Sequence, residues 1–252
     1  MIVLLTDFSN RDPYIGQIEN AIARIAPDEK VINLFSALPA FDVQASAYLL
    51  PAYRQEFSKN TIFLAIVDPG VGGSRLPVIV NADSQLWIGP NNGLFSVICK
   101  RSSRVDACSI CWKPKTLSST FHGRDLFAPV AAMLATGLPV DSETIAVDDL
   151  VKDNWPDDLH EVVYIDHYGN LMTGVRASSV KADVVIELGG KLIYPPDIQS
   201  DQPAGSHTFS DVPQGQLFWY QNANGLVEIA ANQGNAKNLL EARIGQSITF
   251  KT

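Results

Sequence analysis

The stretch that decides the fold runs from Thr61 to Arg75 and reads TIFLAIVDPGVGGSR. Its first half is apolar and rich in β-branched and aromatic residues, which is typical of a buried strand, and the Pro-Gly pair ends that strand in a loop. In open α/β sheets, ligands bind beyond the carboxyl ends of the strands. The loop carries opposite charges at Asp68 and Arg75 and is a candidate site. An ordinary surface ion pair between these two residues explains the same charges.

The segments on either side of this stretch alternate between strand and helix patterns. Strands are predicted over residues 2–6, 30–35 and 61–67, and helices from Pro13 to Pro27 and over residues 42–53. The order β-α-β-α-β predicts a parallel sheet with helices on its faces and with the strand-end loops along one edge. We therefore expect the carboxylates of three loop residues to converge: Asp7, Asp12 and Asp68.

The rest of the first half predicts a hairpin over residues 77–82 and 85–89 and a short helix that ends at Lys100. Phe121-His122-Gly123-Arg124-Asp125 then precedes an alanine-rich helix over residues 126–136. His122 thus lies just before a helix N-terminus, a position that favours negative charge. A structural cap or a packed residue is the alternative interpretation of His122.

The chain changes character after a polar, acidic segment. We predict an α/β nucleoside-binding domain over residues 1–150, a linker over 151–160 and an antiparallel β-barrel or sandwich domain over 161–252. The last region contains six short runs typical of strands, separated by Gly, Asn, Asp and Pro: 161–166, 184–188, 191–194, 216–220, 226–230 and 247–250.

Composition narrows the partners. The 252 residues carry a formal net charge of −8, which disfavours nucleic acid and anionic membranes and favours a small ligand. The segment Met1–Asp7 has no basic n-region and its apolar run is interrupted by Asp7, so we expect a cytoplasmic protein. Three cysteines with a single C-x-x-C are too few for a zinc site or a disulfide framework, and we expect reduced thiols.

Two hypotheses for the chemistry remain open from the residues alone. The sequence lacks the glycine-rich motifs of dinucleotide-binding and P-loop proteins and the G-x-S-x-G of serine hydrolases. In the first hypothesis, Asp7, Asp12, Asp68 and His122 hold a divalent metal for phosphoester hydrolysis. In the second, Asp68, Arg75 and His122 orient a water against an electrophilic carbon without a metal.

Several motifs taken together resemble the S-adenosyl-L-methionine (SAM) hydroxide adenosyltransferases, which are related to fluorinating and chlorinating enzymes. The resemblance runs over nearly the whole chain, in the motifs Leu5-Thr6-Asp7-Phe8, Val67-Asp68-Pro69-Gly70-Val71-Gly72, Gly89-Pro90-Asn91-Asn92-Gly93, Phe121-His122-Gly123-Arg124-Asp125, Tyr168-Gly169-Asn170-Leu171 and Leu226-Val227-Glu228-Ile229-Ala230. It implies a metal-free and cofactor-free reaction in which SAM and water give adenosine and L-methionine. It also implies a homotrimer with sites between subunits.

The resemblance also implies roles for individual residues. The catalytic set is Asp68, Arg75 and His122, with His122 as the base or the orienter of the water. The residues implied in substrate binding are Asp7 and Asp12 at the ribose, Phe41, Phe121 and Gly123 around the ligand, Asp166 at the ammonium, Asn170 at the adenine, and Ala223, Asn224 and Glu228 at or near the loop that holds the carboxylate. Core packing remains an alternative for both phenylalanines, and a turn position for Asn170.

This sequence departs from the family pattern at two places. Ser9 stands where a glycine is usual, so we expect a slightly re-aimed loop, since glycine alone reaches positive φ without strain. Ala223-Asn224 stands where the halogenating branch has Ser-Arg. An anionic Asp68 would repel a halide and therefore favours water as the nucleophile. A halogenase, a metal-dependent nucleotide phosphatase and a non-catalytic nucleoside or SAM sensor remain the alternative functions.

Overall fold

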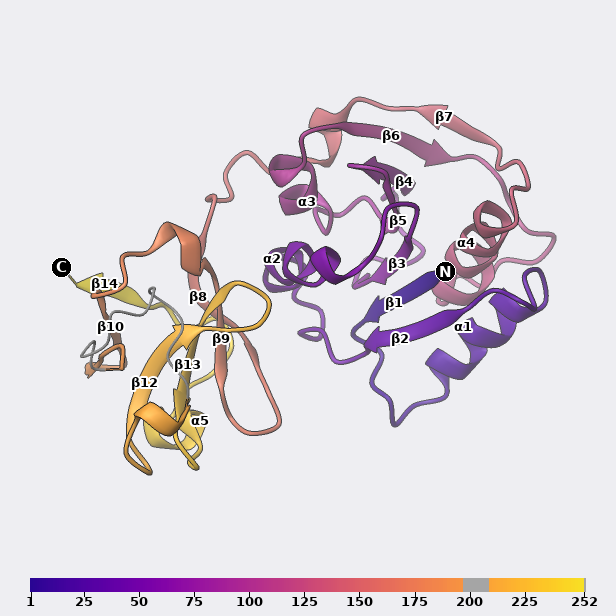
Figure 1. The fold of residues 1–252 in the computed structure, drawn as a ribbon. Helices are drawn as coiled ribbons and strands as arrows, with labels where there is room; N and C mark the ends of the chain where they lie inside the picture. Colours follow the sequence, from indigo (N-terminus) through magenta and orange to yellow (C-terminus); the bar gives the residue numbers. More distant parts are fainter. Residues whose placement is uncertain (197–208, 252) are drawn as a thin grey trace. The chain divides into compact units, whose positions relative to one another are not determined.

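A computed structural model describes residues 1–196 and 209–251 of the chain (Figure 1). These residues form two compact units, Met1–Asp153 and Asn154–Thr252. The boundary between the units falls inside the segment 151–160 that the sequence predicts as a linker. Residues 197–208 and 252 of the predicted β domain lie outside the described residues.

The first unit contains a seven-stranded mixed sheet. Its strand order is β2-β1-β3-β5-β4-β6-β7, and β2, β1, β3 and β5 are parallel neighbours. The strands are β1 (Ile2–Thr6), β2 (Val31–Phe35), β3 (Ile62–Ile66), β4 (Pro77–Ala82), β5 (Gln85–Pro90), β6 (Val105–Ile110) and β7 (Ser142–Thr144). The predicted parallel core and the hairpin are confirmed. The sheet becomes antiparallel beyond β5 because Asp83 and Ser84, at φ 51° and 71°, reverse the chain in a tight turn.

Four helices cover the sheet in two pairs. The helices are α1 (Tyr14–Ala23), α2 (Val43–Tyr53), α3 (Ser96–Arg101) and α4 (Ala128–Ala135). Helix α1 packs against α4, and α2 against α3, on opposite faces of the sheet (Figure 1). The isoleucines of α1 are spaced along one helical face, and Ile15, Ile18 and Ile22 are buried in the core. Burial of each such side chain contributes roughly 1.5–3 kcal/mol.

Helix α4 differs from its prediction at the N-terminal end. A π-helical turn, Gly123–Phe127, precedes the α-helix and contains the first two residues of the predicted helix 126–136. Wide turns of this kind occur mainly at functional sites. The chain therefore leaves His122 and enters a π-turn before regular helix begins.

The second unit consists of two antiparallel sheets and a short helix. The first sheet has the order β12-β13-β9-β8 and the second β11-β10-β14. The elements are β8 (Leu159–Ile165), β9 (Leu171–Arg176), β10 (Val185–Leu188), β11 (Lys191–Ile193), β12 (Leu217–Gln221), β13 (Leu226–Ala231), α5 (Ala236–Leu240) and β14 (Thr249–Lys251). The predicted antiparallel character is confirmed, whereas closure into a barrel stays a prediction.

Two strand assignments in this unit differ from the sequence analysis. Strand β8 begins at Leu159, inside the predicted linker, and β9 was not predicted at all. Gly174 interrupts the apolar pattern of β9, but this position needs a glycine because a Cβ would lie 2.7 Å from the Cβ of Leu159 on β8. The close approach of β8 and β9 thus explains the residue that concealed the strand.

Short 3₁₀ turns complete the description at Arg54–Glu56, Val147–Leu150, Ala177–Ser179 and Phe209–Asp211. Across residues 1–196 and 209–251, each helix is too short or too polar to cross a membrane.

Candidate active site

Asp68 and Arg75 form a buried ion pair beyond the carboxyl end of β3. The Nε of Arg75 donates to Oδ1 and Oδ2 of Asp68 at 3.1 and 3.0 Å, and its Nη2 donates to Oδ2 at 2.5 Å. Their side chains are only 5% and 10% exposed for Asp68 and Arg75 respectively. The surface-pair interpretation therefore does not describe these residues. Removing one partner of a buried pair typically costs ~3–5 kcal/mol, because the remaining charge is left uncompensated.

His122 joins the pair through the same guanidinium nitrogen that donates to Oδ2 of Asp68. The Nη2 of Arg75 lies 2.9 Å from Nδ1 of His122. A guanidinium has only N–H donors, so Nδ1 must accept this bond and the ring proton must lie on Nε2. Burial, reinforced by the charge of Arg75, lowers the pKa of His122, while Asp68 and Asp125 oppose that shift. The imidazole is therefore neutral at neutral pH, with Nε2–H free to donate.

One close approach between backbone segments and one side-chain hydrogen bond hold these residues together. Gly72 has φ 80°, and a Cβ at this position would lie 2.4 Å from the carbonyl oxygen of Ser119. The loop that carries Asp68 and Arg75 can thus touch the segment that carries His122 only if residue 72 is glycine. In addition, Nδ2 of Asn92 donates to the carbonyl oxygen of Val67 at 2.8 Å and fixes the end of β3.

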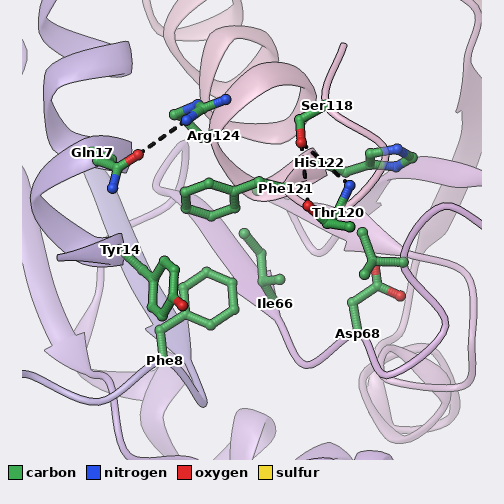
Figure 2. Close-up of a pocket in the computed structure, with 12 residues that line it drawn as sticks. Phe8, Tyr14, Gln17, Ile66, Asp68, Ser118, Thr120, Phe121, His122 and Arg124 are labelled. Carbon is green, nitrogen blue, oxygen red and sulfur yellow. Dashed lines mark hydrogen bonds between the residues drawn. The ribbon is translucent and has the colours of Figure 1, made fainter. Parts of the chain in front are cut away.

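A cavity of about 460 Å³ opens beside Asp68 and His122. Figure 2 shows three aromatic rings, Phe8, Tyr14 and Phe121, gathered on the side of the cavity away from Asp68. Their ring centroids are 5.5 to 5.9 Å apart in tilted and edge-to-face arrangements. The cavity therefore has a polar side at Asp68 and His122 and an aromatic side at the three rings, the mixed lining that is typical of small-molecule sites.

The sequence analysis missed part of this lining. Tyr14 and Gln17 lie one turn apart on α1, and Arg124 follows the His122 motif. The Oε1 of Gln17 accepts a hydrogen bond from Nη1 of Arg124 at 3.0 Å, and the Arg124 guanidinium lies over the Phe121 ring at 5.1 Å (Figure 2). The i, i+3 spacing of Tyr14 and Gln17, directly after the Asp7 loop, was the signal available in the sequence.

Phe121 and Gly123 line the cavity as well. Gly123 is buried, and a Cβ there would lie 3.2 Å from Ile66 and 3.3 Å from the Phe121 ring. A larger residue at this position would narrow the cavity between Phe121 and β3.

Asp7 lies beside this cluster and interacts with the charge of Asp68. Burial raises the pKa of Asp7 and the nearby charge of Asp68 adds to this, while hydrogen bonds from the backbone N–H of Phe41 and of Asp7 itself act in the opposite direction. The bond from Phe41 to Oδ2 of Asp7 is 3.1 Å long. Asp12 is exposed, and within the described residues its side chain makes no hydrogen bond or ion pair. The expected convergence is thus observed for Asp7 and Asp68, and for Asp12 it stays a prediction.

Two residues in the neighbouring loops adopt left-handed backbone conformations. Phe41 has φ 62° and is 75% exposed, so it is not part of the core. Ser9 has φ 65°, its amide donates to the Ser36 carbonyl at 2.6 Å, and its Oγ accepts from the Arg11 amide at 3.1 Å. The loop therefore keeps the left-handed turn for which glycine is suited, although serine is strained there.

In the second unit, Asp166 and Asn170 bind each other across the loop between β8 and β9. The amide N–H and the side-chain Nδ2 of Asn170 donate to the two carboxylate oxygens of Asp166 at 2.8 and 2.9 Å. Asn170 is buried and Asp166 is half-buried. Asn170 is thus both a turn residue and the main partner of Asp166.

Glu228 on β13 is buried with two donors. Tyr220, its cross-strand neighbour on β12, donates its hydroxyl to Oε1 at 2.5 Å, and Asn222 donates Nδ2 to Oε2 at 2.8 Å. Burial raises the pKa of Glu228, the charge of Asp166 adds to it, and the two hydrogen bonds oppose it. Ala223 and Asn224 form the tip of the hairpin beside this carboxylate.

A metal-binding arrangement does not emerge from these residues. Within 1–196 and 209–251, no group of three or more His, Cys, Asp or Glu side chains is placed to hold a metal ion. The hypothesis that Asp7, Asp12, Asp68 and His122 share a divalent metal therefore finds no ligand set in this structure.

The fold and the site define a class of protein: an α/β unit with a buried Asp-Arg-His cluster at the carboxyl ends of parallel strands, followed by an antiparallel β unit. The chain belongs to the SAM hydroxide adenosyltransferase family. The N-terminal domain of that family matches residues 2–143, and its C-terminal domain matches residues 160–249.

Individual proteins from both branches resemble this chain. An (R)-S-adenosyl-L-methionine hydrolase from Thermus thermophilus is 33% identical and covers 98% of this chain and 98% of its own. A fluorinase from Nocardia brasiliensis is 22% identical and covers 100% of this chain and 96% of its own. The crystal structure of an uncharacterized conserved protein from Thermotoga maritima superposes with a TM-score of 0.84 at 28% identity and covers all of both chains.

Proposed function

We propose that this protein hydrolyses SAM to adenosine and L-methionine by attack of water on the ribose C5′. The observation that carries the proposal is the buried Asp68-Arg75-His122 cluster beside the cavity. The hydrolase named among the relatives supports the same reaction.

The reaction suits residues that position and polarise water. A new bond forms between the water oxygen and C5′, the C5′–S bond breaks, and its electron pair returns to sulfur. The leaving group is a neutral thioether released from a sulfonium, so it needs no general acid. The remaining requirement is a water held in line with the C5′–S bond and relieved of a proton.

We propose different roles for Asp68 and His122, and the hydrogen bonds of Arg75 support this division. A carboxylate has about four acceptor sites, so Asp68 retains acceptor capacity after binding Arg75 and can take a proton from the water. His122 presents Nε2–H, which donates to the water oxygen, because its Nδ1 is occupied by Arg75. We therefore assign His122 as the orienter rather than the base. Arg75 holds both residues in place.

The binding roles remain those that the family resemblance implies. Asp7 and Asp12 accept hydrogen bonds from the ribose hydroxyls, and Phe41 and Phe121 border the ligand. In the second unit, Asp166 binds the ammonium, Asn170 reads the adenine, and Ala223 and Asn224 hold the carboxylate. We also propose the homotrimer, because these groups are divided between two units. To test this, the protein is diluted until light scattering shows that the assembly dissociates. We expect the activity to be lost over the same concentration range.

The decisive experiment is incubation of chelator-treated protein with SAM in oxygen-18 water, followed by chromatography and mass spectrometry. We expect adenosine that carries the label in its 5′-hydroxyl. A 5′-halo-5′-deoxyadenosine at moderate chloride would indicate the halogenase, phosphate release from nucleotides that chelation abolishes would indicate the phosphatase, and binding without turnover would indicate the sensor.

A further inference from the structure

The hairpin between β12 and β13 is organised around one residue, Asn222, which makes two side-chain and two backbone hydrogen bonds within it. Its Oδ1 accepts hydrogen bonds from the amides of Asn224 and Leu226, both at 3.0 Å. Its backbone N–H donates to the Leu226 carbonyl at 2.9 Å, and its carbonyl accepts from Gly225 at 3.0 Å. The conformation of residues 222–225, the hairpin loop, therefore depends on the orientation of this one amide group.

That orientation is set by Glu228. An asparagine amide can rotate by half a turn and exchange its oxygen for its nitrogen. The Nδ2 of Asn222 donates to Oε2 of Glu228 at 2.8 Å, and this contact fixes the nitrogen toward Glu228 and the oxygen toward the loop. Glu228 in turn is held by the hydroxyl of Tyr220 at its other oxygen. Tyr220, Glu228 and Asn222 thus form a relay of hydrogen bonds.

Hydrogen-bonding groups at the tip of the loop are available to a ligand. Within the described residues, neither the amide N–H of Ala223 nor the side chain of Asn224 has a hydrogen-bond partner. Ala223 is exposed. Glu228 itself is 3% exposed, and each of its oxygens already has a partner. A ligand can therefore reach the tip of the loop but not the carboxylate beneath it.

We infer that Glu228 is a positioning residue that holds the 222–225 hairpin loop, through Asn222, in the conformation that binds the amino-acid end of the substrate. The inference rests on the proposed function and changes the role of Glu228 from direct contact to support. Ala223 and Asn224 contact the substrate. Tyr220 supports Glu228 as the first member of the hydrogen-bond relay. Preorganisation of this kind contributes to substrate affinity rather than to the chemical step.

The test compares Glu228→Ala with Glu228→Gln. Alanine removes both acceptors and releases Asn222, so we expect KM for SAM to rise about 10-fold with kcat changed much less, as for the loss of a charge-assisted hydrogen bond. Glutamine can still accept from Asn222 and donate to the oxygen of Tyr220, so it should recover most of that loss. Hydrogen exchange should show faster exchange of the Asn224 and Leu226 amides in Glu228→Ala only.

Asn232→Ala is the matched control. Asn232 follows the other end of β13, is 9% exposed, and donates Nδ2 to the Val212 carbonyl at 2.6 Å. Its loss should lower stability while KM and the exchange of the Asn224 and Leu226 amides stay at parental values. Unchanged loop exchange in Glu228→Ala, or a glutamine variant as impaired as alanine, would overturn the inference. A parent protein that forms no adenosine would instead refute the proposed function, and the exchange experiment would still decide the relay.

Discussion

The Asp68 cluster of the first unit (Asp68, Arg75, His122) and the Asp166 cluster of the second (Asp166, Asn170, Tyr220, Asn222, Glu228) both contain shielded carboxylates, but they balance charge differently. Asp68 has a guanidinium in bidentate contact. Glu228 has only neutral donors, and the charge that acts on it is a second carboxylate, Asp166.

This difference indicates what each cluster does. A neutralised carboxylate is stable without a ligand and can be kept rigid for chemistry. A buried carboxylate whose ionisation is opposed by a neighbouring carboxylate, as that of Glu228 is by Asp166, is stabilised when a cation arrives nearby. The first cluster is therefore complete by itself, and the second is suited to receive a positively charged group, as the proposed ammonium site requires.

The largest effect should follow from Asp68→Asn. This variant keeps the size of the side chain but removes the proton acceptor, so kcat should fall by ~10²–10⁴ while KM stays within a few-fold. Asp158→Asn is the matched control, because Asp158 and Arg176 form a similar two-oxygen ion pair, at 2.7 and 2.8 Å, in the second unit. Steady-state adenosine formation measures both variants. A turnover number near the parental value in Asp68→Asn would show that the first cluster is only structural.

Asp166→Asn should have the next largest effect, and on a different parameter. Loss of a charged hydrogen bond to the substrate ammonium should raise KM by roughly 10- to 100-fold and leave kcat nearly unchanged. The substitution also removes the like charge beside Glu228. The free energy of unfolding in urea should therefore fall less than the rise in KM alone would suggest. A variant that lost kcat and kept KM would contradict the contrast between the clusters.

The pH dependence of His122 sharpens the comparison further. Its pKa lies below the ordinary 6.5, so the folded protein resists protonation that the unfolded chain accepts. The associated stability is present above pH 6.5 and is lost as the pH falls through the folded pKa. Urea unfolding of the parent and of His122→Gln, compared from neutral pH downward, should show this acid-dependent loss in the parent alone. Parallel curves would place the ring outside the buried cluster.

The smallest effect concerns the loop beside the first cluster. Ser9→Gly should stabilise the protein by up to about 1 kcal/mol, because glycine adopts φ 65° without the cost that serine bears. Gly72→Ala should act in the opposite direction, since its Cβ would meet the Ser119 carbonyl at 2.4 Å. Urea denaturation of both variants measures whether the free energy of unfolding rises for Ser9→Gly and falls for Gly72→Ala. A destabilised Ser9→Gly would show that the serine hydroxyl, through Arg11, matters more than the backbone.

Local patterns in the sequence were sufficient to place part of the first cluster. The apolar run before Asp68 and the alternation of strands and helices place Asp7 and Asp68 at neighbouring strand ends, as observed. The place of Asp12 stays a prediction, because an exposed loop residue is not fixed by strand pairing. The residues alone grouped His122 with Asp68 and Arg75 only as one of two open hypotheses, and the family resemblance decided between them, because no local pattern reports contacts between distant segments.

The second cluster was less accessible to such patterns. Gly174 interrupts the strand pattern of β9 and concealed that strand. The glycine is needed there because β8 packs too closely for a side chain. Tyr220 was recoverable: the Asn-Gly loop closes the hairpin at residues 222–225, and counting outward from it pairs Tyr220 with Glu228. The burial of Glu228 and the partial burial of Tyr220, on which the effect of that pair depends, are set by the whole sheet.

The contact of Gly72 with Ser119 also bears on how the protein folds. Arg75 and His122 are 47 positions apart in the chain, and bringing such distant segments together carries a loop-closure entropy that neighbouring contacts avoid. Contacts of this range tend to form after the local helices and hairpins, on the native side of the folding barrier. Gly72→Ala should therefore accelerate unfolding and leave the refolding rate nearly unchanged. During synthesis, Arg75 and His122 can meet only after the chain has been made through His122.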